Sequence, residues 1–171
     1  MAAQPCCLSS SARPWRQSAG GRLTRATGIR NQSTCRLHHM NTRTATCSCG
    51  QLTLTVRGEP IRVSVCHCLA CQRRTGSVFG AQARFPRSSV TISGRSTEYV
   101  RTGDEGSRVI FSFCPQCGAT VHYSVEGHDE GSISVPVGAF ADPEFPVPSF
   151  SVYEERMHSW ISLPAGVEHM A

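Results

Sequence analysis

The chain has 171 residues, 39% of them hydrophobic and 17% charged, and a formal net charge of +5 from 17 arginines against 12 acids. This length suits one ordinary globular domain, and no apolar run approaches the roughly 18–20 residues of a membrane-spanning helix. Residues 1–39 carry the excess of positive charge, with six arginines and no acid, and the remaining eleven arginines face all 12 acids. A phosphate-binding surface would keep its positive charge in the folded part. The composition therefore argues against both a nucleic-acid partner and a membrane.

Residues 1–39 are rich in Ser, Arg, Ala and Gly and have no periodic apolar pattern. They lack the apolar core of a signal peptide. Two interpretations stay open: an upstream segment translated from a mis-assigned start, with Met40 as the initiator, and a mitochondrial transit peptide, which is typically rich in Arg and Ser. The first implies a cytoplasmic protein, which we expect, and the second a mitochondrial one. In either case residues 40–171 are predicted to form the folded domain.

The folded part carries the signals of short strands. Leu52, Leu54 and Val56 alternate with polar residues. Further strand-like runs follow at 78–85, 90–93, 97–101, 109–113, 120–125, 132–137 and 150–156, separated by Gly, Pro, Asp and Ser clusters. No window has a long 3.6-residue periodicity. The fold class is therefore predicted to be mainly β, as an antiparallel sandwich or open barrel.

Seven of the 10 cysteines lie close together in short motifs within this part. Cys114-Pro-Gln-Cys117-Gly118 is a tight turn of the kind that brings two thiolates to one metal ion. A redox Cys-x-x-Cys motif normally opens a helix, whereas this one separates two strand-like runs, so a zinc site is favoured. The cysteines of Cys47-Ser-Cys49 and of Cys66-His-Cys68 are too close in sequence for ordinary disulfide geometry.

The spacing predicts two unequal metal sites. Cys47 and Cys49 can complete a four-thiolate site with the Cys114 turn, which leaves three cysteines within six residues: Cys66, Cys68 and Cys71. Four-ligand zinc sites hold structure, while sites with three protein ligands keep a position for water or substrate. Two alternatives stay open: His67 as a fourth ligand of the second site, and Cys47 with Cys49 joining the Cys66 cluster instead.

The ordered motifs C-x-C-G, C-H-C-x-x-C-Q-R-x-x-G and F-C-x-x-C-G resemble those of the glutathione-dependent formaldehyde-activating enzymes, a family that includes the centromere protein V-like proteins. The resemblance runs from about Thr44 to Leu163. It implies a small β-tent built around a structural zinc on Cys47, Cys49, Cys114 and Cys117. It also implies a second, catalytic zinc on Cys66, Cys68 and Cys71, and so two zinc ions per chain.

The resemblance further implies a carbon–sulfur lyase that joins glutathione and formaldehyde reversibly into S-hydroxymethylglutathione. The alternative is a non-catalytic zinc-binding module of the same fold. Glutathione, the expected small-molecule partner, carries two carboxylates, and Arg73 and Arg74 are candidates to bind them because Arg grips carboxylates in a bidentate manner. A solvated loop pair is the alternative for these two residues. We expect His122 to be structural, and Trp160 to be a core aromatic residue rather than a wall of the pocket.

Overall fold

The computed structural model describes residues 41–104, 106–127 and 131–170. The predictions for the segment 1–39 therefore lie outside the described residues. The described part is mainly β, as the strand-like runs predicted, with one α-helix, α1 (Leu69–Thr75). Its helical segments are all too short or too polar to cross a membrane. The helix was not predicted, because seven residues cover only two turns and give no periodicity to detect.

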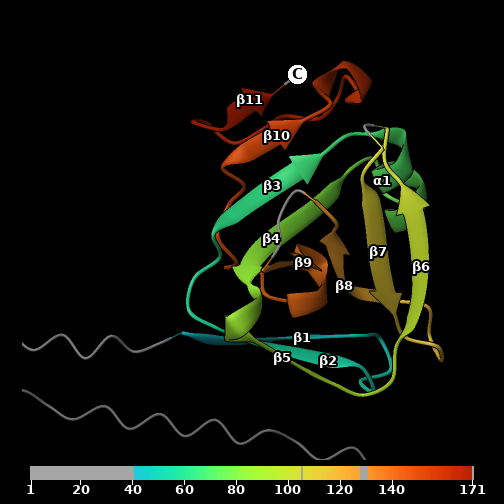
Figure 1. The fold of residues 1–171 in the computed structure, drawn as a ribbon. Coiled ribbons are helices and arrows are strands. Elements are labelled where there is room, and N and C mark those ends of the chain that lie inside the picture. The colour runs from blue at the N-terminus through green and yellow to red at the C-terminus, as the bar shows by residue number, and fades with distance from the viewer. Residues whose placement is uncertain (1–40, 105, 128–130, 171) are drawn as a thin grey trace, which may run out of the picture. The chain divides into compact units, whose positions relative to one another are not determined.

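Three antiparallel strands form the smaller sheet: β1 (Thr42–Thr46), β2 (Thr53–Arg57) and β5 (Val90–Ser93), in the order β1-β2-β5 (Figure 1). Leu54 and Val56 of β2 are fully buried, as their alternation with polar residues predicted. β1 was not predicted, because its only apolar residue is Ala45. Its pairing with β2 places that alanine in the core.

Eight strands form the larger sheet, in the order β11-β10-β3-β4-β9-β8-β7-β6. They are β3 (Arg62–Cys66), β4 (Gly80–Pro86), β6 (Thr97–Thr102), β7 (Arg108–Phe113), β8 (Thr120–Val125), β9 (Ser132–Pro136), β10 (Phe150–Val152) and β11 (Glu168–Met170). β10 runs parallel to both β3 and β11, and the other neighbouring pairs are antiparallel. β3 and β11 were not predicted. The predicted strand at 150–156 ends earlier, at Val152, because Tyr153 has a left-handed backbone (φ 59°) and a single 3₁₀ turn follows.

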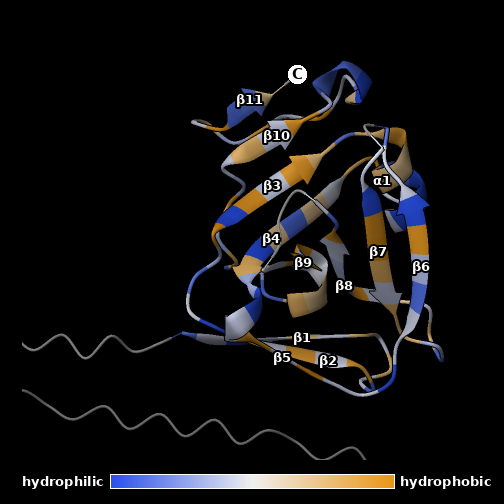
Figure 2. Cartoon of the chain, viewed as in Figure 1, coloured by the Kyte–Doolittle hydropathy of each residue, from blue (hydrophilic) through white to orange (hydrophobic). Residues whose placement is uncertain are grey.

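The hydrophobic core combines side chains from both sheets. Its fully buried members are Ala45, Leu52, Leu54, Val56, Ala83, Phe85, Cys114, Val121 and Val135. On β4, Ala83 and Phe85 enter this core while Gln82 and Arg84 point to the opposite face, since side chains alternate along a strand. Hydrophobic and more hydrophilic residues likewise alternate along β3, as the colours of Figure 2 show. One face of the larger sheet thus makes the core, and the other remains for a site.

Candidate metal centres

Four cysteines from two distant turns meet at the first candidate centre. The turn after β1 contributes Cys47 and Cys49, and the turn between β7 and β8 contributes Cys114 and Cys117; the four sulfurs lie within 4.8 Å of one another. The Sγ atoms of Cys47 and Cys49 are 3.5 Å apart, and those of Cys49 and Cys114 are 3.6 Å apart. Zn–S bonds of about 2.3 Å in a tetrahedron separate the sulfurs by about 3.8 Å. These residues fit a zinc ion, and their separations are far too long for disulfide bonds.

The two turns have matching backbone hydrogen bonds. The N–H of Cys47 donates to the carbonyl of Leu52 at 2.9 Å, and the N–H of Cys114 donates to the carbonyl of Ala119 at 3.0 Å. In the second turn Gly118 adopts a φ of +74°, a left-handed conformation that glycine accepts without strain. Each turn also directs N–H groups at sulfur, for example Leu52 N–H to Cys47 Sγ at 3.3 Å. Such donors stabilise thiolates, the form that binds metal.

The pKa values within the four-cysteine cluster point in opposite directions. Burial opposes ionisation of Cys114, but hydrogen bonds from the Gln51 side chain and from the backbone N–H groups of Cys117 and Gln116 outweigh it and lower the pKa to about 6. The hydrogen bond that Cys49 accepts from the backbone N–H of Gln51 lowers its pKa, yet local desolvation and the neighbouring sulfurs outweigh it and raise the pKa to about 12. Four thiols this close together cannot all ionise, because the negative charges repel one another, unless a cation lies among them. A divalent metal removes that conflict.

Three cysteines form the second candidate centre, where β3 meets α1. Cys66 ends β3, Cys68 is the N-cap of α1, and Cys71 lies in the first turn of the helix. The N–H of Cys71 donates to the sulfur of Cys68 at 3.3 Å, and all three sulfurs lie within 4.8 Å of one another. A hydrogen bond from Cys66 lowers the pKa of Cys71 to about 6, against the effect of burial, and nearby Arg74 lowers it further. The residues thus fit a metal ion, with three protein ligands.

His67 lies between two of these cysteines but outside the cluster. Its side chain is fully buried, at 0% exposure, and packs edge-on against Phe79 with ring centroids 6.1 Å apart. Neither ring nitrogen has a hydrogen-bond partner among the described residues, and the ring is not among the grouped ligand atoms. Burial lowers its pKa, so the imidazole stays neutral. His67 is therefore a buried packing residue.

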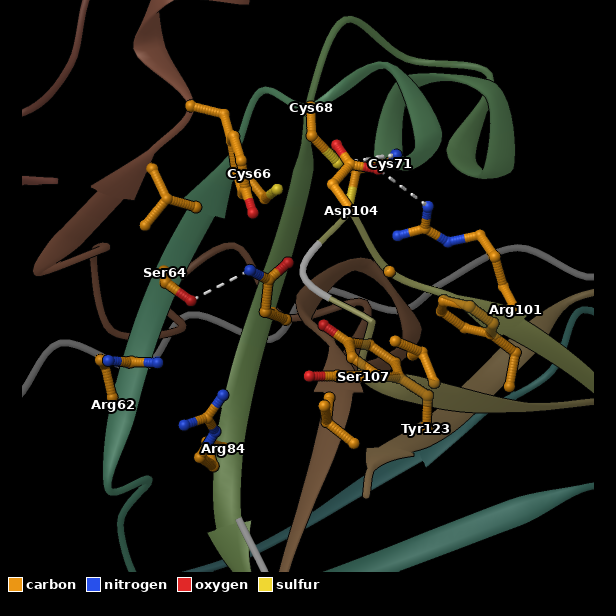
Figure 3. Close-up of a pocket in the computed structure, with 17 residues that line it drawn as sticks. Arg62, Ser64, Cys66, Cys68, Cys71, Arg84, Arg101, Asp104, Ser107 and Tyr123 are labelled. Atoms are coloured by element: carbon orange, nitrogen blue, oxygen red, sulfur yellow. Dashed lines mark hydrogen bonds and ion pairs between the residues drawn. The ribbon is translucent and has the colours of Figure 1, made fainter. Parts of the chain in front are cut away.

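The three-cysteine cluster opens into a cavity of about 450 Å³ on the face of the larger sheet opposite the core. Part of its wall follows a row of directly paired residues. Arg62 faces Arg84, and the row continues through buried Ser134, which does not line the cavity, to Tyr123, which does. Also lining the cavity, Gln82 donates a hydrogen bond to the hydroxyl of Ser64 at 3.0 Å (Figure 3).

Three arginines line this cavity: Arg62, Arg84 and Arg101. Arg101 is held by an ion pair with Asp104 at 3.8 Å, and Asp104 lines the same cavity (Figure 3). Sequence reasoning missed all three, because each belongs to a different strand. Only the register of the sheet shows that Arg62 and Arg84 are neighbours.

Arg73 and Arg74, which were predicted to bind substrate, do not line this cavity. Both line a neighbouring cavity of about 620 Å³. The guanidinium of Arg74 lies over the rings of Phe111 and Tyr123, 5.1 and 5.4 Å from their centroids. Trp160 is 69% exposed, so the prediction of a core aromatic was wrong. Trp160 lies in a segment outside the strands, and its ring packs edge-on against the ring of His158.

Comparison with known proteins identifies the family. The family model described as "Glutathione-dependent formaldehyde-activating enzyme" matches residues 42–156. This chain belongs to that family. A search of curated proteins finds no match. The chain is also similar to the crystal structure of a Rhodobacter sphaeroides protein, with 23% identity and a TM-score of 0.44, over 56% of this chain and 85% of that one.

Membership of the glutathione-dependent formaldehyde-activating family agrees with the resemblance in the cysteine motifs. The matched residues include both cysteine clusters and all three arginines of the cavity. The described residues contain two clusters able to bind metal ions, one with four cysteines and one with three.

Proposed function

We propose that this protein is a zinc-dependent carbon–sulfur lyase that forms and breaks a glutathione–aldehyde adduct of the S-hydroxymethylglutathione type. The observation that carries the proposal is the three-cysteine cluster at the wall of an arginine-lined cavity. A structural cluster has no need of a cavity, and the four-cysteine cluster lines neither of the two cavities beside α1. We place the protein in the cytoplasm, with the mitochondrion as the alternative.

The reaction needs a thiolate close to an aldehyde carbon. In the forward direction one S–C bond forms between the thiol sulfur and the carbonyl carbon, and the thiol proton ends on the carbonyl oxygen, so that nothing is oxidised or reduced. Cys66, Cys68 and Cys71 would hold a zinc ion with one coordination position free, and a zinc ion lowers the pKa of a thiol that binds to it. Because the addition already proceeds without a catalyst, thiolate formation and proximity are all that the protein must supply.

The arginines of the cavity are suited to hold the carboxylates of glutathione. Arg62 and Cys66 lie on the same face of β3, about 13 Å apart at their Cα atoms from a rise of about 3.3 Å per residue. A tripeptide-sized thiol spans about 10 Å when extended. Because the long side chains of Arg62 and Arg84 cover part of the distance, the sulfur can lie at the cysteines while a carboxylate meets one of the two guanidinium groups. Ser64 and Gln82 line the same cavity and offer polar groups for the peptide amides.

Metal counting and a spectroscopic titration test this proposal. Two zinc ions per chain are expected, against about one for a non-catalytic module. With Co²⁺ in place of zinc, adding glutathione should change the visible absorption of the three-cysteine site, because a fourth sulfur enters its coordination. A protein with two Co²⁺ ions and an unchanged spectrum at saturating glutathione would contradict the proposal.

The arginines give an independent test. Arg84→Gln removes a charged hydrogen-bond donor, typically worth about 1.5–3 kcal/mol. We expect KM for glutathione to rise by about 10- to 150-fold with little change in kcat, as for an interaction made equally in ground and transition states. Arg57→Gln, an exposed arginine on the smaller sheet, is the matched control. Equal KM values for the two variants would remove Arg84 from the binding site.

A further inference from the structure

Two ligand-sized cavities meet at the three-cysteine cluster. The second cavity, of about 620 Å³, shares Cys71, Arg101 and Phe111 with the first. Both volumes fall in the range of about 300–1,000 Å³ that is usual for small-molecule sites. A molecule that reacts at the cluster therefore has space for a group on either side of its sulfur–carbon bond.

The two cavities differ in chemical character. The first is the more polar of the two, with a wall in which Ser64, Gln82 and Arg84 lie among apolar side chains. The second has mainly apolar and aromatic walls with three arginines at them, and no carboxylate among the described residues that line it: Ala70, Cys71, Arg73, Arg74, Tyr99, Arg101, Phe111, Phe113, Gly118 and Thr120. A peptide with carboxylates suits the first cavity, whereas an apolar group suits the second.

The aromatic wall is set by strand register. Tyr99 of β6 lies directly opposite Phe111 of β7, which lies directly opposite Tyr123 of β8. Tyr99 and Phe111 line the second cavity and Tyr123 the first, so the boundary between the cavities crosses this row.

The guanidinium of Arg74 lies at this boundary, over the rings of Phe111 and Tyr123. Its Nε and Nη2 atoms are buried, without a hydrogen-bond partner among the described residues. A group packed in this way forms part of the wall rather than an open anchor for a carboxylate.

We propose that the second cavity binds an apolar substituent on the aldehyde carbon, so that the substrate class is the hemithioacetal of glutathione with a larger aliphatic or aromatic aldehyde. This inference rests on the proposed function and specifies its aldehyde. Formaldehyde carries only hydrogen on its carbonyl carbon and leaves the second cavity unused. The chemical step is unchanged: one S–C bond forms, and the thiol proton passes to the carbonyl oxygen.

Binding of stable thioethers tests the inference without a reaction. S-methylglutathione and S-hexylglutathione differ by five methylenes, and each buried methylene is worth about fourfold in affinity. Burial of three of them predicts that S-hexylglutathione binds the zinc-loaded protein about 60-fold more tightly in isothermal titration calorimetry.

Variants locate the alkyl chain. Thr120→Trp places a large side chain in the second cavity and should abolish the preference for S-hexylglutathione while leaving S-methylglutathione binding unchanged. Tyr99→Ala removes an aromatic wall from the edge strand and should weaken the preference. Val100→Ala, its neighbour on the same strand, lines neither cavity and is the matched control. Unfolding midpoints confirm that each variant is folded.

The outcomes separate the inference from the proposed function. Equal affinity of the two thioethers, or a preference that survives Thr120→Trp, overturns the inference and leaves the lyase proposal standing. Failure of glutathione and both thioethers to bind contradicts the proposed thiol, and the inference with it. Tight S-hexylglutathione binding that is lost only in the cavity variants supports both.

Discussion

The four-cysteine cluster should act as a cross-link between the two sheets, and Cys117→Ser tests this. Cys117 is exposed, so the substitution removes a metal ligand without opening a cavity in the core. The cluster joins the turn after β1 to the turn between β7 and β8, and its members Cys49 and Cys114 are 65 residues apart. Closing a loop of that length removes about 4 kcal/mol of unfolded-state entropy at 25 °C.

Cys47, Cys49 and Cys114 still join the two turns in the variant, so we expect the free energy of unfolding of Cys117→Ser to fall by up to about 4 kcal/mol, the full loss if the metal is released. This is a large part of the 5–15 kcal/mol that is usual for a domain. This corresponds to a fall in Tm of roughly 10–20 °C. Urea denaturation of the zinc-loaded proteins measures the loss, with Ser48→Ala as the control, because Ser48 is exposed between Cys47 and Cys49 and is not a ligand.

The second cluster offers an internal comparison. Cys66 and Cys71 close a loop of only six residues, for which the same relation gives about 2 kcal/mol. Cys68→Ser should therefore destabilise the protein less than Cys117→Ser does. If Cys117→Ser unfolded at the urea concentration of the wild type, or if Cys68→Ser were the more destabilised, the cross-link reasoning would be refuted.

Three other predictions concern single residues. Cys68→Ser should keep the fold, because Ser is a good N-cap for α1, but lose exchange between glutathione and its aldehyde adduct, as followed by NMR; full exchange would remove the cluster from catalysis. Gly94→Ala should destabilise the protein by about 2–4 kcal/mol in urea denaturation, since a Cβ there would lie 1.9 Å from the carbonyl oxygen of Gln51. Gly106→Ala, also at positive φ but in open space, is its control, and equal losses would contradict the clash. Burial raises the pKa of Tyr123 from 10.0, so its folded form keeps a proton that the unfolded chain loses. Stability should fall above pH 10 by about 1.4 kcal/mol per pH unit, and Tyr123→Phe should remove this slope in urea titrations; an unchanged slope would assign it to another group.

The sequence by itself determined the features that are local in the chain. Alternation at Leu54 and Val56 predicted a strand with one buried face, and the strand is there. The prediction was possible because side chains alternate between the two faces of an extended chain, so the pattern is written in consecutive residues. The cysteine spacings predicted metal ligands, because two thiolates on one tight turn already fix half of a tetrahedral site. The family followed from the order of these motifs.

Only the tertiary structure decided which side chains surround the open cluster. The spacing of the cysteines left Cys47 and Cys49 free to join either site, and the structure brings them to Cys114 because β1 and β2 pack against the far face of the larger sheet. Arg62, Arg84 and Arg101 come from three strands and meet through strand register, a long-range property that no local pattern records. Arg73 and Arg74, adjacent to Cys71 in sequence, turn instead toward the second cavity, because the helical rotation of α1 sets their direction.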